Sequence, residues 1–312
     1  MARRNKNDEF YTKLEDIESE LSHYRHHFVG KTVFCNCDDP TWSNFWRYFH
    51  VNFADLGLKR LIATHYNRDG GMSYAMEYTG GDDLNVEFGV MSVLSGDGDF
   101  RSAECIALLQ QADIVVTNPP FSLFREYVAQ LVDYNKLFVI IGSENAITYK
   151  DFFVLLRNNI VWKGFSHVKE FLQPSGEIKK FGNICWFTNL DITKRHVPFF
   201  DPESVHAQYV GNEDAYPRYD NYAAINVNRT KDIPEDYFDV MGVPITFLDK
   251  YNPDDFEILG ITCRGYSPEY RTKLYDSVSY PNANDLNGSG CILVDGQPKM
   301  LYGRILIKRK IT

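Results

Sequence analysis

One short segment of the sequence combines residue types that are suited to chemistry: Asn118, Pro119, Pro120 and Phe121. It directly follows the apolar run 113–117, which is typical of a strand buried on both faces. Open α/β sheets bind their ligands at the carboxyl ends of such strands. The prolines lack backbone N–H donors and stiffen the turn. The side-chain carbonyl of Asn118 and the backbone carbonyl of Pro119 therefore remain as hydrogen-bond acceptors for a substrate.

Two adjacent acceptors suit the methylation of an amino group on a nucleic-acid base. The lone pair of that nitrogen is delocalised into the ring, and acceptors that hold both of its hydrogens favour a more pyramidal and nucleophilic nitrogen. A methyl group could then pass in line from a sulfonium donor without a metal ion. Phe121 offers a flat apolar face to a base that has left the duplex. The structural alternative is a rigid turn that buries Phe121.

The elements that must position this segment follow an alternating pattern. Short apolar runs alternate with amphipathic segments through the first half of the chain, which is typical of parallel strands joined by helices. An aromatic helix is expected after the first strand, with Asp39 as its N-cap and Pro40 in its first turn. Glycine-rich turns at 80–83 and 95–99 flank short strands that are expected to form a hairpin. Strands are predicted at 32–37, 60–64, 113–117 and 137–142.

The texture of the sequence changes at Asp191. From there on the chain is rich in Pro, Asn, Asp and Tyr and has no long helical period. We therefore expect an α/β domain over residues 1–190 and an irregular or β-rich lobe over residues 191–312.

Composition and charge exclude several classes of protein. The net charge of −9 argues against a protein that coats nucleic acid indiscriminately. No stretch approaches the roughly 20 apolar residues of a membrane span, and the first residues lack the apolar core of a secretory signal, so we expect a cytoplasmic protein. The six cysteines form no CxxC pair, and none follows a proline, which disfavours a cytosine C5 methyltransferase. His23, His26 and His27 fit a solvated charged helix, and no metal site is predicted.

The segment 118–121 and several longer stretches resemble the adenine-specific DNA methyltransferases of the EcoRI type, within the amino-methyltransferases that carry an Asn/Asp-Pro-Pro-aromatic motif. The resemblance spans nearly the whole chain and includes residues 8–12, 33–40, 182–189 and 242–253. It implies a Rossmann-like class I methyltransferase sheet, S-adenosylmethionine as cofactor, and direct in-line transfer to the N6 amino group of a flipped adenine. Residues 191–312 would then be a target-recognition lobe.

The resemblance also implies roles for individual residues. Phe10, Tyr11 and Thr12 would pack against the cofactor; Asn36 and Asp38 would line its amino-acid or ribose end; Asp99 and Phe100 would hold its adenine; Asn118 would touch both cofactor and target. Alternatively, Thr12 caps a helix over 13–24 and Asp97 and Asp99 are turn residues. The loop after the first strand lacks the usual glycines, and the second strand ends without the usual acidic residue, so no ribose contact is assigned.

Double-stranded DNA is the partner that the resemblance implies. Lys163, Lys169, Lys179 and Lys180 would border the DNA groove. In the expected strand 182–189, alternation points one of Trp186 and Phe187 inward, and we favour Trp186 as the packed residue, which leaves Phe187 for the base. A monomer is expected, and a cognate restriction endonuclease is compatible as a genetic partner. The alternatives are methylation of an RNA base, methylation of a protein glutamine, and a non-catalytic nucleic-acid-binding protein.

Overall fold

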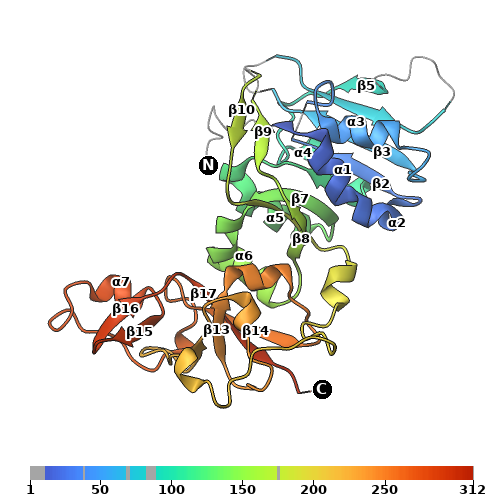
Figure 1. The fold of residues 1–312 in the computed structure, drawn as a ribbon. Helices are drawn as coiled ribbons and strands as arrows, with labels where there is room; N and C mark the ends of the chain where they lie inside the picture. The colour runs from blue at the N-terminus through green and yellow to red at the C-terminus, as the bar shows by residue number, and fades with distance from the viewer. Residues whose placement is uncertain (1–10, 38, 68–70, 82–88, 174–175, 312) are drawn as a thin grey trace. The chain divides into compact units, whose positions relative to one another are not determined.

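The chain forms two compact units in the computed structural model (Figure 1). The first contains the described residues up to Ala146 together with Val161–Ile192. The second contains Ile147–Ile160 and the residues from Thr193 onward. The structure describes residues 11–37, 39–67, 71–81, 89–173 and 176–311.

An eight-stranded sheet of order β5-β4-β3-β2-β6-β7-β11-β8 forms the centre of the first unit. The neighbours β3, β2, β6 and β7 are parallel, whereas β4, β5, β11 and β8 each pair antiparallel with their neighbours. The predicted strands are confirmed. A hairpin of β4 and β5 is present, but its first strand ends before the glycine-rich segment 80–83 and so lies earlier than predicted. The strands are β2 (Thr32–Cys35), β3 (Arg60–His65), β4 (Tyr74–Tyr78), β5 (Val90–Val93), β6 (Ile114–Thr117), β7 (Leu137–Ser143), β8 (Trp162–His167) and β11 (Ile184–Thr188).

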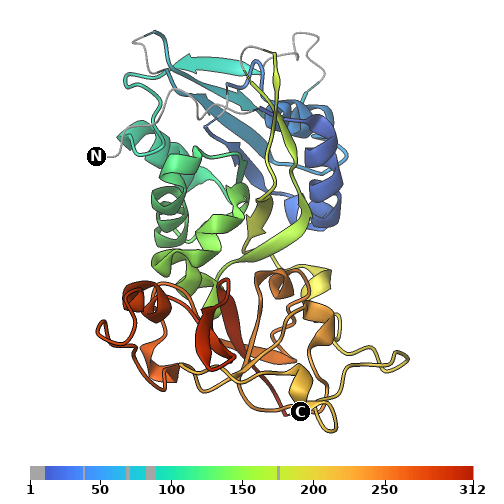
Figure 2. The same cartoon turned by 60° about the vertical axis from the view of Figure 1, so that its left-hand side comes forward.

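Helices cover both faces of this sheet, which explains why β2 and β6 are apolar throughout. Figure 2 shows the blue helices α1 (Leu14–Leu21), α2 (Arg25–Phe28) and α3 (Asn44–Val51) on one face. The green helices α4 (Ala103–Gln111) and α5 (Phe124–Asp133) lie on the other. The unit is therefore a mixed α/β fold.

The aromatic helix α3 begins later than predicted. Its N-cap is Ser43, whose hydroxyl accepts from the Phe45 N–H at 3.2 Å. The Asp39 carboxylate instead accepts from the Thr41 N–H at 2.9 Å and from the Tyr74 hydroxyl at 2.6 Å, so it stabilises a turn before the helix. The expected cap at Asp39 is wrong because these tertiary and local partners take its oxygens. Trp42 consequently lies outside the helix and is exposed.

A separate three-stranded sheet consists of β1 (Tyr11–Thr12), β9 (Glu170–Leu172) and β10 (Ile178–Lys180), in the order β1-β9-β10. Thr12 pairs with Phe171 in this sheet. The N-cap of α1 is Lys13, without a side-chain capping bond, so the alternative that Thr12 caps this helix is wrong.

The second unit is β-rich, and it includes Ile147–Ile160 besides the residues from Thr193 onward. Its four-stranded sheet has the order β12-β13-β17-β14, and β15 and β16 form a hairpin. None of the helices in the described ranges is long and apolar enough to cross a membrane. The strands are β12 (Ile225–Asn226), β13 (Met241–Pro244), β14 (Phe256–Ile261), β15 (Cys291–Val294), β16 (Gln297–Met300) and β17 (Arg304–Arg309), and the helices are α6 (Lys150–Arg157) and α7 (Ala283–Asn287).

Short 3-10 helices connect many of these elements in both units. They are η1 (Ser22–Tyr24), η2 (Phe121–Leu123), η3 (Glu144–Thr148), η4 (Thr193–His196), η5 (Glu213–Ala215), η6 (Thr230–Asp232), η7 (Ile245–Asp249) and η8 (Pro268–Tyr270).

A buried carboxylate attaches α1 to the sheet. Glu20 is completely buried, and its oxygens accept from the Tyr24 hydroxyl at 2.8 Å and from the Phe165 N–H at 2.8 Å. The N–H and hydroxyl of Ser166 also donate to it, both at 2.7 Å. These donors compensate for the loss of hydration of the carboxylate.

We predict that Glu20→Gln lowers the free energy of unfolding by about 2–3 kcal/mol. The neutral amide loses the charge-assisted hydrogen bonds, and its NH₂ group would face the hydroxyl and N–H donors that the carboxylate accepts from. Urea denaturation of the full chain measures this. Glu18→Gln, on the exposed side of the same helix, is the control and should change it by less than about 0.5 kcal/mol. Equal effects of the two substitutions would contradict the role given to Glu20.

Candidate active site

The carboxyl ends of the parallel strands bring the predicted site residues together. β2 lies between β3 and β6, so the chain order reverses between β2 and β6, and such a switch point opens a crevice for ligands. Asn36 and Cys37 follow β2, and Asn118 follows β6. The Thr117 hydroxyl donates to the backbone carbonyl of Asn36, which ties the two strand ends together.

A pocket at this edge joins two groups of residues that lie about 20 positions apart in the sequence. Asp99 and Phe100, predicted to hold adenine, share it with Pro120 of the Asn-Pro-Pro-Phe segment. The complete lining is Cys37, Tyr66, Gly98, Asp99, Phe100, Pro120 and Leu123. The structure therefore places part of the predicted cofactor set beside the predicted catalytic set.

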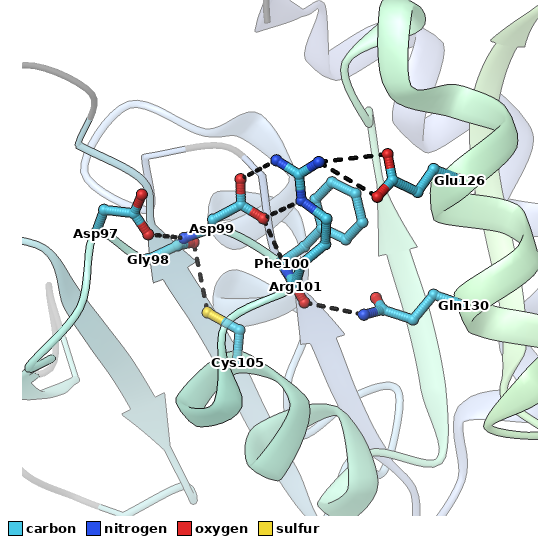
Figure 3. A network of polar contacts seen from close by, with 8 residues as sticks. All are labelled: Asp97, Gly98, Asp99, Phe100, Arg101, Cys105, Glu126 and Gln130. Carbon is cyan, nitrogen blue, oxygen red and sulfur yellow. Dashed lines mark hydrogen bonds and ion pairs between the residues drawn. The ribbon is translucent and has the colours of Figure 1, made fainter. Parts of the chain in front are cut away.

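The segment that carries Asp99 is a hydrogen-bonded turn (Figure 3). The Asp97 carboxylate accepts from the Asp99 N–H at 3.0 Å, and the Asp99 carboxylate accepts from the Arg101 N–H at 2.9 Å. The alternative that these aspartates are turn residues is thus confirmed, while Asp99 also lines the pocket. The ring of Phe100 packs edge-on against Tyr127, with 5.0 Å between ring centroids.

Asn36 is fixed by a residue that the sequence reasoning missed. The hydroxyl of Tyr127 donates to the side-chain oxygen of Asn36, which is buried. Complete burial raises the pKa of Tyr127 well above its ordinary value, so the hydroxyl keeps its proton. The signal was a tyrosine on the apolar face of α5, three residues after Phe124. The Asn36 amide therefore has a defined orientation at the end of β2.

Cys37 supplies the backbone conformation that a glycine usually provides. Its φ is 81°, in the left-handed region that is unfavourable for a residue with a Cβ atom. The loop after β2 thus makes a glycine-like turn although it has no glycine there. Two further predicted cofactor residues, Phe10 and Asp38, lie outside the described residues.

An acidic side chain reaches the end of β3 from another part of the chain. The Asp39 carboxylate lies 3.4 Å from Nδ1 of His65, the last residue of β3. Burial alone would raise the pKa of Asp39, but hydrogen bonds from Tyr74 and Thr41 outweigh it and lower that pKa. The end of the second parallel strand therefore has a carboxylate beside it although its own residues are not acidic.

The Asn-Pro-Pro-Phe segment presents one buried polar and one half-buried aromatic side chain. Asn118 is 7% exposed. The ring of Phe121 meets the rings of Phe171 and Phe181 edge-on, each at 6.1 Å between centroids. Phe181 is half-buried, and the ammonium group of Lys179 lies 5.3 Å from its ring centroid. The sequence reasoning missed Phe181, although it stands just before the segment 182–189.

Thr12 has a buried hydroxyl beside this aromatic group. It is 1% exposed, and its Oγ1 has no hydrogen-bond partner among the residues that the structure describes. Tyr11 pairs with Leu172 in the same small sheet. A buried hydroxyl without a partner is costly and is a candidate contact for a polar ligand atom.

Two residues expected at the DNA surface are buried instead. Lys163 is 2% exposed and forms an ion pair with Glu144 at 2.6 Å. Phe187 is completely buried and packs against Phe124, at 5.7 Å between centroids. Trp186 is equally buried on the opposite face, against Phe45. Both aromatic residues are packed because β11 lies inside the sheet with helices on both sides.

The remaining lysines of the predicted surface are exposed. Lys169 stands just before β9, and Lys179 and Lys180 belong to β10. Lys180 lies 3.5 Å from the Glu170 carboxylate, but its side chain is 80% exposed. These three lysines and Phe181 therefore lie on or directly beside the antiparallel pair β9 and β10, which we call the β9–β10 arm.

Comparisons with known proteins agree over the length of the chain. A family model described as adenine-specific methyltransferase EcoRI matches residues 1–310. The Type II methyltransferase M.EcoRI of Escherichia coli is 49% identical over 287 residues, which cover 83% of this chain and 87% of that protein. The Type II methyltransferase M.MpnI of Mycoplasma pneumoniae is 36% identical over 330 residues, covering 99% and 97%. M.MgeORF184P of Mycoplasma genitalium is 35% identical over 331 residues, covering 99% and 98%. No solved structure matches the chain significantly.

Because the backbone at Cys37 is left-handed, we predict that glycine is more stabilising than alanine at this position, the reverse of the usual order within a strand. Cys37→Gly should be more stable than Cys37→Ala by about 0.5–1 kcal/mol, because glycine relieves the strain. Chemical denaturation measures the difference. At Cys35, in the extended strand β2, the same pair of substitutions should give the opposite order. The same order at both positions would argue against strain at Cys37.

Proposed function

The chain belongs to the EcoRI family of adenine-specific methyltransferases, and on this basis we propose that it transfers a methyl group from S-adenosylmethionine to N6 of adenine in double-stranded DNA. The observation that carries the proposal is the pocket that joins Asp99 and Phe100 to Pro120 at the carboxyl edge of the sheet. The parallel core and the switch point between β2 and β6 support a Rossmann-like class I methyltransferase sheet.

Two residues of the pocket, together with Asn36, Thr12 and Tyr11 outside its lining, carry groups suited to such a cofactor. Asp99 would accept a hydrogen bond from the adenine amino group, and Phe100 would pack against the adenine ring. Asn36, oriented by Tyr127, would bind the amino-acid end. The buried Thr12 hydroxyl would find its missing partner there, with Tyr11 beside it. S-adenosylmethionine supplies an electrophilic methyl group when it is bound.

Asn118 and Pro119 would activate the target amino group. Their carbonyl oxygens would accept hydrogen bonds from its two hydrogens, which holds the nitrogen in a pyramidal geometry with its lone pair directed for in-line attack. The burial of Asn118 keeps water away from these bonds and strengthens them.

Phe121 and Phe181 would form the walls of the target-base site. Their rings meet edge-on at 6.1 Å, so a flipped adenine that separates them could stack on at least one aromatic face. Phe181 takes the role that the sequence analysis assigned to Phe187, which is buried in the core.

The β9–β10 arm would border the DNA. Lys169, Lys179 and Lys180 are exposed there and would contact phosphates. We leave Lys163 out of this surface because it is buried against Glu144. In the division of labour that we propose, residues 1–190 bind cofactor and catalyse, and the lobe from residue 191 reads the target sequence.

Methyl transfer from radiolabelled S-adenosylmethionine tests the proposal directly. The purified chain is offered duplex DNA, structured RNA and total protein in parallel reactions, and modified-base sequencing of the DNA then identifies the base and its sequence context. We expect label in DNA only, as N6-methyladenine at a defined site. Label in RNA or in glutamine would favour the alternative substrates, and cofactor binding without transfer to any of the three would contradict the proposal.

We predict that Asn118→Ala abolishes methyl transfer while cofactor affinity changes by less than about tenfold, or 1.4 kcal/mol. The alanine removes an acceptor needed for activation, whereas Asp99 and Phe100 remain. Asn118→Asp is the matched variant, because a carboxylate still accepts hydrogen bonds, and it should retain measurable activity. Wild-type activity in Asn118→Ala would refute the mechanism.

We predict that Phe121→Ala and Phe181→Ala each lower kcat/KM for duplex DNA by about 10- to 100-fold, since a base–aromatic stack contributes roughly 1–3 kcal/mol. A mismatched target adenine should suffer a smaller loss, because less free energy is needed to flip it. Phe165→Ala, which removes a half-buried ring that stacks on His23, is the control and should change kcat/KM by less than about threefold. An unaffected Phe181→Ala would exclude that ring from the base site.

A further inference from the structure

We propose that Arg101 is a positioning residue that fixes the Asp99 carboxylate in the pocket and thereby makes the cofactor site selective for adenine over other purines. The inference rests on the proposed function, because it takes Asp99 as the acceptor for the adenine amino group. Arg101 itself does not line the pocket.

The guanidinium of Arg101 binds both oxygens of Asp99 (Figure 3). Nε donates to Oδ1 at 2.8 Å and Nη2 donates to Oδ2 at 2.7 Å. The backbone N–H of Arg101 also donates to Oδ1, at 2.9 Å. A bidentate guanidinium defines both the position and the plane of a carboxylate, which a single ion pair does not.

Helix α5 holds the outer side of Arg101. Nη1 lies 3.3 Å from each carboxylate oxygen of Glu126. One turn further along the helix, the side chain of Gln130 donates to the backbone carbonyl of Phe100 at 3.1 Å. Arg101 therefore connects the pocket carboxylate to a rigid helix, as the sticks in Figure 3 show.

The Arg101–Asp99 ion pair contributes little to the stability of the fold, but it fixes the orientation of the Asp99 carboxylate. The side chains of Arg101 and Asp99 are 31% and 18% exposed, and a partly solvated ion pair contributes little to stability. An ionised carboxylate only accepts hydrogen bonds. Held in place, it accepts from an amino group at purine C6 and repels a carbonyl oxygen at the same position. A carboxylate free to rotate would avoid that repulsion and lose the selectivity.

Helix α5 extends the connection to catalysis. It begins at Phe124, three residues after the Asn-Pro-Pro-Phe segment ends. Glu126 and Gln130 hold the 99–101 segment, and Tyr127 holds Asn36. The cofactor contacts and the catalytic turn thus share one helix, so an error in the position of Asp99 would displace the cofactor relative to Asn118.

Binding of two matched ligands to the full chain tests the inference. S-adenosylhomocysteine carries an amino group at purine C6, and S-inosylhomocysteine carries a carbonyl oxygen there. Calorimetry without DNA gives the dissociation constant of each. We expect the wild type to favour the adenine ligand at least about tenfold, since a site built to bind an amino group rejects an analogue without it.

In Arg101→Gln the adenine ligand should bind about 10- to 30-fold more weakly while the inosine ligand changes by less than about threefold, so the preference collapses. Glu126→Gln should reduce the preference by a smaller factor. Arg60→Gln is the matched control, because it also removes an arginine–glutamate pair, formed with Glu77 on β4, and both ligands should bind within twofold of wild type.

Equal weakening of both ligands in Arg101→Gln would overturn the inference, since that is the result of a general structural role. An unchanged preference would overturn it as well. If thermal unfolding shows that Arg101→Gln does not fold, Arg101→Lys replaces it, because lysine keeps the charge but cannot bind both oxygens in one plane; a wild-type preference there is again the contradicting result. Failure of the wild type to bind either ligand would instead contradict the proposed function.

Discussion

The pairing of β2 with β6 is the constraint on which the rest of the site depends. Parallel strands end at the same edge of a sheet, and here the bond from the Thr117 hydroxyl to the Asn36 carbonyl fixes the two ends against each other. Asn36 and Cys37 follow one of these ends and Asn118 follows the other, so this pairing sets the distance between them. Because chain order reverses between these strands, the helices that follow them, α3 and α5, lie on opposite faces of the sheet, and such a switch point opens a crevice for ligands.

Helix α5 holds the residues around these strand ends in fixed positions. It packs on the sheet through Phe124, and its polar side chains reach back to segments that lie before it in sequence. Tyr127 orients Asn36, and Gln130 binds the backbone of Phe100. Sites held on helices and strands are more precise than sites on free loops. The loops of this pocket gain that precision from a helix they do not belong to.

The sequence predicted the parts of this architecture that depend on local pattern. Apolar runs revealed the parallel strands, and the position of Asn118 after one of them revealed the edge that matters. It failed where a residue's environment depends on distant partners. The sequence predicted Lys163 to be an exposed cation. In the structure Lys163 is buried and forms an ion pair with Glu144, which directly follows β7. Phe187 counted as half exposed because alternation assumes one open face, whereas β11 is inserted between β7 and β8 and covered on both sides.

Two features of the usual pattern are absent from the sequence, the glycines after the first strand and the acidic residue after the second, and the structure shows what such patterns encode. The usual glycine after the first strand reflects a need for left-handed backbone at that position, and Cys37 adopts this backbone with a φ of 81°. The usual acidic residue after the second strand reflects a need for a carboxylate at the end of that strand. Here the Asp39 carboxylate, from the loop after β2, lies beside His65 at the end of β3. Local sequence records which residue type usually satisfies a physical demand. Only the folded chain shows that the demand can be met by a different residue at a modest cost in strain, or by the same chemistry from a different position.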